Sequence, residues 1–234
     1  MTTSPTSPTA GLVIEDRTLN RAAIKEFADD ADTVTLLRCN LEDADLAGLA
    51  MPGWTFDACI FKHAKLVGAM LAGSVWTGCR GAFADFTGAS LNEARIQSSD
   101  FNNSNFRGAT LTSASFMRCK LTGSNLAETK SLNVSFEETL LGGVNMPAFS
   151  FRKAVLKRLD FQSADLKKCD FREARFVDCI LRDTNLIDCR FEGADLRGAD
   201  LGGIRLLNAK LFKGATISRA QAGQLLAELG LNVQ

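Results

Sequence analysis

The feature that most constrains the fold is a large apolar residue at every fifth position from residue 36 to residue 211. Only Gly81 and Ser131 interrupt this series of 36 positions. A period of five matches neither the 3.6-residue period of an α-helix nor the two-residue period of a flat strand, so no ordinary amphipathic element places all these side chains on one side. The sequence therefore predicts an internal repeat architecture.

Each five-residue unit combines a short extended segment with a turn. The residue two before the apolar centre is small, and side chains two apart in an extended segment share a face. The residue directly before the centre is often Asp or Asn and the residue two after it is often Gly, which are residues that favour turns. If each unit turns the chain by about a quarter circle, four units close one coil, and the chain forms about nine stacked coils around a narrow core.

The units resemble those of a known family. Residues 44–48 (ADLAG), 164–168 (ADLKK) and 194–198 (ADLRG) resemble the A(D/N)LXX unit of pentapeptide repeat proteins. The resemblance implies an all-β solenoid, a right-handed quadrilateral β-helix, with the centre and the residue two before it inside and the other three residues outside. We expect a disordered tail at residues 1–11, an N-terminal cap at 12–33, the β-helix at 34–214 and a C-terminal cap or dimerisation segment at 215–234.

Both ends of the repeat region carry helical patterns, and short helices there would cover the open ends of the core. Thr18 is a candidate N-cap for a short helix that runs to Phe27. Ser218 and Gln221 have the spacing of a capping box, and the helix that follows is expected to end at Gly230. The residues after Gly230 alternate in polarity as in a final strand.

The segment 217–233 resembles the C-terminal tail of the gyrase-protecting pentapeptide repeat proteins, which are the Qnr-type, albicidin-resistance and mycobacterial fluoroquinolone-resistance proteins. In that subgroup the tail makes a tail-to-tail two-fold dimer, so the resemblance implies a homodimer. The alternative is a plain cap that covers the last coil. The residues expected to form the dimer contact are Leu225, Leu226, Leu229, Leu231 and Val233.

The cysteines and the histidine, which are residue types that often carry chemistry, occupy regular positions of the repeat. All seven cysteines fall at the small inward position, where free Cys acts as a core filler, so we expect neither disulfides nor a metal site. The single histidine, His63, falls at an outward turn, and no nucleophile triad, HExxH, P-loop or Rossmann fingerprint occurs. We expect a protein with no enzymatic activity and no cofactor.

The composition also bears on the compartment. No apolar run is long enough to span a bilayer, and no secretion signal precedes the repeats. An odd number of cysteines without a secretion signal suits a reducing compartment. We expect a cytoplasmic, bacterial protein without a membrane partner.

The subgroup resemblance implies a protein that mimics duplex DNA, binds DNA gyrase or topoisomerase IV and protects it from quinolones or peptide toxins. A DNA mimic presents negative potential to a basic groove. The net charge here is zero, with nine acids against four bases in residues 1–50 and fourteen bases against ten acids in residues 151–213. The competing hypothesis is an interaction module or inhibitor for another protein, such as a plasmid-transfer or secretion component, or a delivered effector.

A partner surface must use the outward positions that the core leaves free. Nucleic acid is not an expected partner, because the basic segment 152–175 lacks interleaved exposed aromatic residues and is balanced by acids. The candidate contact residues are Asp45, Asp85, Asp165, Ile60, Met70, Ile180, Ile187 and Leu207.

Four of the residues that depart from the size pattern of the core are relevant to the shape of the rod. Phe149 and Leu159 are bulky at the small inward position, and Gly81 and Ser131 leave two centres underfilled. We expect the rod to bulge near residues 146–159 and to narrow near Gly81, with local repacking as the alternative.

Overall fold

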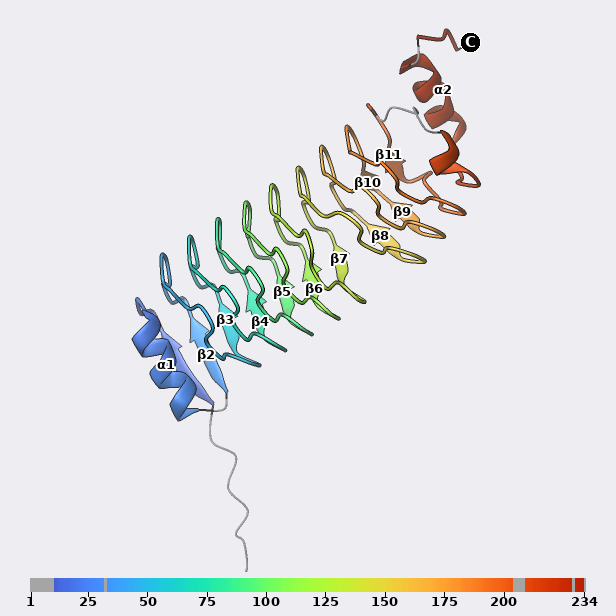
Figure 1. The fold of residues 1–234 in the computed structure, drawn as a ribbon. Helices are drawn as coiled ribbons and strands as arrows, with labels where there is room; N and C mark the ends of the chain where they lie inside the picture. Colours follow the sequence, from blue (N-terminus) through green and yellow to red (C-terminus); the bar gives the residue numbers. More distant parts are fainter. Residues whose placement is uncertain (1–10, 32, 204–208, 229, 234) are drawn as a thin grey trace, which may run out of the picture.

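The computed structural model describes residues 11–31, 33–203, 209–228 and 230–233. The chain winds into a β-solenoid whose coils stack along one axis (Figure 1). One short parallel strand from each coil enters a sheet of nine strands in sequence order. These strands are β1 (Leu12–Glu15), β2 (Val34–Leu37), β3 (Thr55–Asp57), β4 (Val75–Thr77), β5 (Arg95–Gln97), β6 (Ser115–Met117), β7 (Ser135–Glu137), β8 (Val155–Lys157) and β9 (Arg175–Val177). A second parallel pair joins β10 (Cys179–Ile180) to β11 (Ala199–Asp200).

Residues that lie 20 positions apart are neighbours in adjacent coils. Phe56 pairs with Trp76, and Trp76 pairs with Ile96. Between residues 40 and 195 the isolated bridges on the other sides of the rod keep the same offset, as in the bridge from Asp85 to Asn105. Four five-residue units therefore make one coil, which confirms the predicted β-solenoid.

The four sides of the rod are named here by their inward centres. Face A holds the sheet, with centres such as Phe56 and Trp76. Face B has centres such as Leu41 and Phe61, face C has Leu46 and Leu66, and face D has Met51 and Leu71. All eight of these centres are buried.

Burial of the centres and the geometry of the corners explain the repeat. Each large buried centre contributes about 1.5–3 kcal/mol of hydrophobic free energy before the loss of chain entropy is subtracted. At the corners the backbone adopts positive φ, for example 58° at Asp43 and 69° at Gly48. Gly, Asn and Asp tolerate this left-handed conformation best, which is why they recur two residues after the centre.

The N-terminal cap differs from the prediction in two respects. Strand β1 pairs with β2 through Leu12 and Val34, so the sheet begins one coil before the first apolar centre. Helix α1 (Arg21–Asp30) follows, and its N-cap is Asn20, whose side chain accepts a hydrogen bond from the Ala23 N–H at 3.1 Å. The prediction of Thr18 as N-cap was wrong, because Thr18 forms a parallel bridge with Asn40 and belongs to the solenoid.

The C-terminal cap contains a short 3-10 helix, η1 (Ala209–Phe212), and helix α2 (Arg219–Glu228). The capping box is confirmed, since Gln221 N donates to Ser218 Oγ at 3.1 Å and Ser218 N donates to Gln221 Oε1 at 2.7 Å. The predicted final strand was wrong. Gly230 turns the chain with a φ of 81°, and Leu231 N donates back to Leu226 O, so the helix end uses the donor that a strand would need. Of the expected tail at residues 1–11, only Gly11 lies within the described residues.

Within residues 33–177 the hydrogen-bond ladder of the solenoid is interrupted at one junction, between residues 128–135 and residues 147–155. We call this junction the ladder break. On face D, Leu111 N donates to Lys130 O and Phe151 N to Asp170 O, both at 2.8 Å, but Ser131 N has no such partner among the described residues. Strands β7 and β8 pair at one position, whereas β6 and β7 pair at three. Figure 1 shows the coil of β8 set off from that of β7 on this side, while the turns on the opposite side stay evenly spaced.

The size of the core residues accounts for the ladder break. The ring of Phe149 occupies an inward position that is Ala in several earlier coils, and it lies 6.3 Å from the ring of Phe136 and 6.1 Å from that of Phe151. This extra volume lies within the predicted bulge. At Gly81 the contacts fit the alternative of local repacking, because a Cβ on Gly81 would overlap the ring of Phe101.

Candidate functional site

The three acidic candidates lie in one outward column on face C. Asp45, Asp85 and Asp165 are separated by whole coils, and Lys65 and several Asn residues occupy the other positions of the column. The side chains bond along the column, as when Asn185 Nδ2 donates to Asp165 Oδ1 at 3.0 Å. Each Asp also accepts a backbone N–H two residues later, for example that of Ala47 to Asp45 at 3.0 Å. These carboxylates therefore stabilise the turns as well as facing outward.

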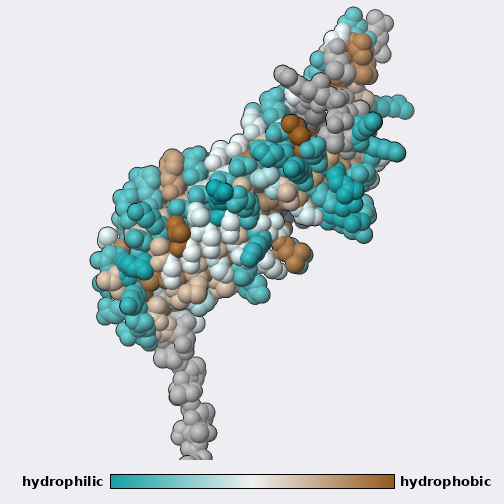
Figure 2. Space-filling model, viewed as in Figure 1, coloured by the Kyte–Doolittle hydropathy of each residue, from teal (hydrophilic) through white to brown (hydrophobic). Residues whose placement is uncertain are grey.

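The apolar candidates do not share a face. Ile60 and Ile180 lie half-buried in one column on face B, whereas Met70 is exposed on face D and Ile187 is exposed on face C. Leu207 lies outside the described residues. Figure 2 shows isolated hydrophobic side chains among hydrophilic ones on the side in view. The structure thus does not bring the predicted contact residues into one patch.

Ion pairs between and within coils balance much of the charge of the basic segment. Arg152 and Lys153 both contact Glu173, at 3.2 and 3.7 Å, and Lys157 contacts Glu137 at 3.3 Å. Further along, Arg172 lowers the pKa of Asp170, and Arg197 lowers the pKa of Asp195 to about 2. These pairs are largely exposed, so each adds little stability, but together they mix the two signs of charge along the rod.

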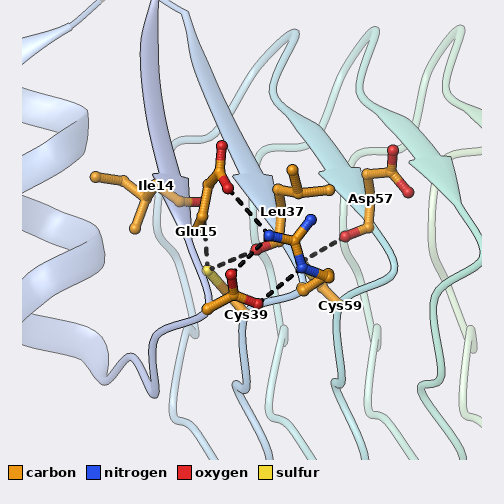
Figure 3. A network of polar contacts seen from close by, with 8 residues as sticks. Ile14, Glu15, Leu37, Cys39, Asp57 and Cys59 are labelled. Carbon is orange, nitrogen blue, oxygen red and sulfur yellow. Dashed lines mark hydrogen bonds and ion pairs between the residues drawn. The ribbon is translucent and has the colours of Figure 1, made fainter.

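The cysteines are free and buried, and their thiols bond to backbone carbonyls of the core. Figure 3 shows the Cys39 thiol directed at the carbonyls of Ile14 and Leu37, at 3.5 and 3.6 Å. Burial raises the pKa of Cys59 to about 11 and that of Cys79 to about 12. Such thiols remain protonated near neutral pH and are poor nucleophiles. Within the described residues no group of three or more metal-ligating side chains comes together.

An exposed aromatic pair was missed from the sequence. His63 lies at an exposed corner, as predicted, and its ring stacks on that of Phe83 with centroids 5.2 Å apart. Phe83 is 51% exposed and has a φ of 61°, a conformation that is unfavourable for a bulky residue. Phe83 lies two residues after a centre, and its position in the repeat is the signal that marks it as outward.

Helix α2 closes the solenoid with one side. Gln221 Nε2 donates to the carbonyls of Leu196 and Ala199, at 2.8 and 2.6 Å, and Leu225 is buried. Leu225 therefore belongs to the cap rather than to an exposed dimer contact.

The other side of the C-terminal cap is apolar and open. Leu226, Leu231 and Val233 are 40%, 55% and 53% exposed. An open groove of about 680 Å³ is lined there by Ala220, Gly223, Gln224, Ala227, Leu231, Asn232 and Val233. Leu229, the remaining dimer candidate, lies outside the described residues.

Comparison with known families gives a direct match. A family model described as pentapeptide repeats matches residues 39–78, 59–97, 89–127, 135–172 and 164–203, with eight copies. The matched segments leave out residues 128–134, which form one side of the ladder break. No curated protein sequence matches the chain.

One solved structure of a pentapeptide repeat protein shares the fold, and a second protein of this family is matched at a lower TM-score. HetL from the cyanobacterium Nostoc sp., which is involved in heterocyst differentiation regulation, matches with a TM-score of 0.64 and 18% identity over 85% of this chain and 92% of HetL. A trypsin-treated form of QnrB1, a plasmid-mediated fluoroquinolone resistance protein, matches with 23% identity and a TM-score of 0.40, over 96% of this chain and 98% of QnrB1. None of the helices in the described residues has the length and apolar character needed to cross a membrane.

Proposed function

Since the chain belongs to the pentapeptide repeat family, we propose that it is a non-enzymatic, protein-binding solenoid that dimerises through its C-terminal cap. The observation that supports the dimer is the exposed apolar side of this cap, formed by Leu226, Leu231 and Val233. Single exposed apolar residues are ordinary on a protein surface, but here three lie within eight residues at the end of the rod.

A second copy of the chain suits this surface because a two-fold contact uses the same patch on both molecules. Leu231 and Val233 line the groove, and they are also the side chains available to enter the groove of a second copy. Gln221 and Leu225 are already committed to the solenoid, so the other side of α2 remains for the contact. The two rods would then extend in opposite directions from a shared centre.

The dimer is tested by light scattering coupled to gel filtration. A chain that ends after Ala215, and a full-length Leu231→Glu/Val233→Glu variant, are expected to elute with the monomer mass at micromolar concentration. Ile187→Glu, which changes an exposed apolar residue on the shaft, should keep the dimer mass. A wild-type monomer, or a Glu variant that still dimerises, would contradict the proposal.

For the partner we propose DNA gyrase or topoisomerase IV. The support is the resemblance of residues 217–233 to the tail of the gyrase-protecting members, together with three outward carboxylates, Asp45, Asp85 and Asp165, in one column of face C. The ion pairs of residues 151–200 mix the charges near the proposed dimer centre. The contact would therefore depend on the shape of the rod more than on long-range steering, and added salt should weaken it only modestly.

The partner is tested by titrating the protein into gyrase supercoiling reactions with and without a fluoroquinolone. Protection of supercoiling, or inhibition at higher concentration, is expected at micromolar protein. Absence of both effects would exclude this partner. The Leu231→Glu/Val233→Glu variant then shows whether the effect depends on the dimer.

One observation favours a second candidate, an interaction module or inhibitor for a different protein. Residues 151–213 carry fourteen bases against ten acids, and a tail-to-tail dimer places this excess at its centre, where a DNA mimic is acidic. A plasmid-transfer component, a secretion component or the target of a delivered effector would be the partner in that case. Affinity capture with the wild-type protein that recovers such a component, and no topoisomerase, would support it.

A further inference from the structure

The ladder break points to the form in which a partner is bound. We propose that it receives an extended peptide segment of the partner as an inserted β-strand, with an apolar residue over Ser131 and acidic residues toward its ends. This inference rests on the proposed protein-binding function and specifies the contact. An added strand satisfies backbone groups of the sheet, and its side chains provide the selectivity.

Both sides of the ladder break present backbone groups without partners among the described residues. In the preceding coil the equivalent N–H groups are all bonded: Gly108 N donates to Ala127 O, Leu111 N to Lys130 O and Ser113 N to Leu132 O. One coil later this pattern stops. The donors that lack their partner in the adjacent coil are the N–H groups of Glu128, Ser131, Asn133, Ser150 and Val155, and the matching acceptors are the C=O groups of Thr129, Val134, Pro147, Ser150 and Arg152.

The distribution of these groups fits an inserted strand. A parallel strand bonds to both of its neighbours, and here one coil offers donors and acceptors from one side while the next coil offers them from the other. Most of the free groups lie on face D, before the corner at Asn133, so a segment of about five residues would cover them. Each coil would then recover the pairing that every neighbouring coil has.

The core beneath the ladder break is underfilled and partly accessible. In the preceding coil the inward residues Ala109 and Leu111 are fully buried. The equivalent residues at the break, Thr129 and Ser131, are only half-buried, and so is Val134. Ser131 is a small residue at a position that holds Leu, Phe or Met in most coils. An apolar side chain from the inserted strand would fill this space and gain the free energy of burial.

The rim of the ladder break selects for negative charge. Lys130, Arg152 and Lys153 lie there, and Arg152 and Lys153 share one carboxylate, that of Glu173, at 3.2 and 3.7 Å. The other carboxylate, that of Glu128, is already contacted by Arg107 at 2.7 Å, so the bases outnumber the acids at this rim. Leu132 is the most exposed large apolar residue of the described chain, at 69%. The segment that fits best therefore has an apolar middle and acidic ends.

A peptide taken from this chain provides a defined probe. Residues 84–93 (ADFTGASLNE) carry two negative charges and place Leu91 where a face D centre belongs. In hydrogen exchange on the full-length protein, the five free amides should exchange at least about tenfold faster than Gly108, Leu111 and Ser113. Saturating peptide should slow them at least about tenfold. A control peptide with Ser90→Pro and Leu91→Pro lacks the two central N–H donors and should not slow the exchange of these amides.

Protein variants distinguish insertion of the peptide as a strand from nonspecific binding. Ser131→Leu fills the vacant core position and should lower peptide affinity at least tenfold while the melting temperature is kept or raised. Lys153→Glu should lower the peptide affinity several-fold. Arg80→Glu, a charge reversal on face B, should leave the peptide affinity unchanged. Should Ser131→Leu fail to fold, the proline peptide still tests the role of the main chain.

Three results would overturn the inference. The first is slow exchange of the five amides in the free protein, which would mean that the coils pair there after all. The second is equal binding of the native and proline peptides, and the third is protection by the peptide at the C-terminal cap instead of at the ladder break. Because the dimer mass and the supercoiling assay are measured without the peptide, the inserted strand can fail while the proposed function stands. Protection by the peptide without any effect on supercoiling would instead exclude gyrase as the partner and leave the inserted strand standing.

Discussion

At the scale of the residue, position within the five-residue unit decides what a side chain does. The cysteines illustrate this, because their chemistry suggests metal or redox sites while their position predicts core packing. The structure confirms the position: the thiols of Cys59, Cys79 and Cys119 each donate to a carbonyl 23 residues earlier at 3.2–3.3 Å. Burial raises the pKa of Cys119 to about 11, in line with the other two thiols.

This position predicts slow thiol chemistry. At pH 8 the native protein should resist iodoacetamide, because a group with a pKa of about 11 or 12 stays protonated there and the core excludes the reagent. All seven cysteines should react once guanidinium unfolds the chain. Mass spectrometry of the alkylated protein measures both states, and rapid native labelling of Cys59 or Cys79 would show that the core is open.

Gly81 provides a prediction about packing. Gly81→Ala should destabilise the protein by about 1–3 kcal/mol, because the new methyl group would overlap the ring of Phe101. Gly142→Ala is the matched control, since its nearest neighbour would lie at an ordinary contact distance of 3.6 Å. Urea unfolding of the two variants measures the difference. A similar loss in both would mean that Phe101 can move away.

The pair of Asp195 and Arg197 predicts an effect of acid. A carboxylate whose pKa is lowered on folding stabilises the native state above the unfolded pKa, and this contribution is lost as pH falls through the folded value. For Asp195 the window runs from the unperturbed value of 3.8 down to about 2. Asp195→Asn should therefore flatten the fall of melting temperature in this window relative to wild type. Asp43→Asn is the control. If this variant flattens the fall of melting temperature equally, the effect of acid cannot be assigned to Asp195.

At the scale of the element, the helices at the two ends show what local sequence can and cannot predict. The spacing of Ser218 and Gln221 was sufficient to predict the capping box, because both residues lie within one turn. The second role of Gln221, which donates to Leu196 and Ala199, depends on residues 22 and 25 positions away. In the same way Thr18 fits the local pattern of an N-cap, but pairing with Asn40 draws it into the sheet.

Gln221 should be the residue on which the closure of the last coil depends. Gln221→Leu removes two bonds to carbonyls at the end of the core and should cost about 1–3 kcal/mol locally. Hydrogen exchange should then accelerate in residues 194–203 and change little in residues 39–127. Gln224→Leu, on the exposed side of α2, is the control, and equal effects of the two substitutions would contradict this role for Gln221.

At the scale of the whole molecule, stability is close to a sum over coils and the junctions between them. The five-residue period was enough to predict the coil, its core and its register, because the coils repeat the same packing of buried centres and the same turns. The ladder break could be predicted only in part. Phe149 signalled a bulge within residues 146–159, but the loss of pairing also involves Ser131 and Val134 in the preceding coil. The five-residue period does not predict which outward residues form a contact surface, because Met70, Ile180 and Ile187 lie on three different faces.

The weak junction predicts how the rod unfolds. Because several bonds between adjacent coils are missing at the ladder break, residues 12–127 and residues 156–203 should open as separate cooperative units. Hydrogen exchange at intermediate urea should resolve two free energies of opening. Ser131→Leu should bring them closer by restoring the core across the junction. A single opening free energy in the wild type would show that the junction transmits cooperativity fully.

The 20-residue register also determines what an insertion or deletion would do to this protein. Removing five residues keeps every remaining centre in the core, yet it rotates everything downstream by a quarter turn, so that the column of Asp165 would move from beneath Asp85 to an adjacent side of the rod. Removing twenty residues shortens the rod and leaves each column in phase. Insertions or deletions of five residues would thus bring different outward residues onto the same side of the rod while the interior stays the same. Such changes can create new partner surfaces that point substitutions alone do not create.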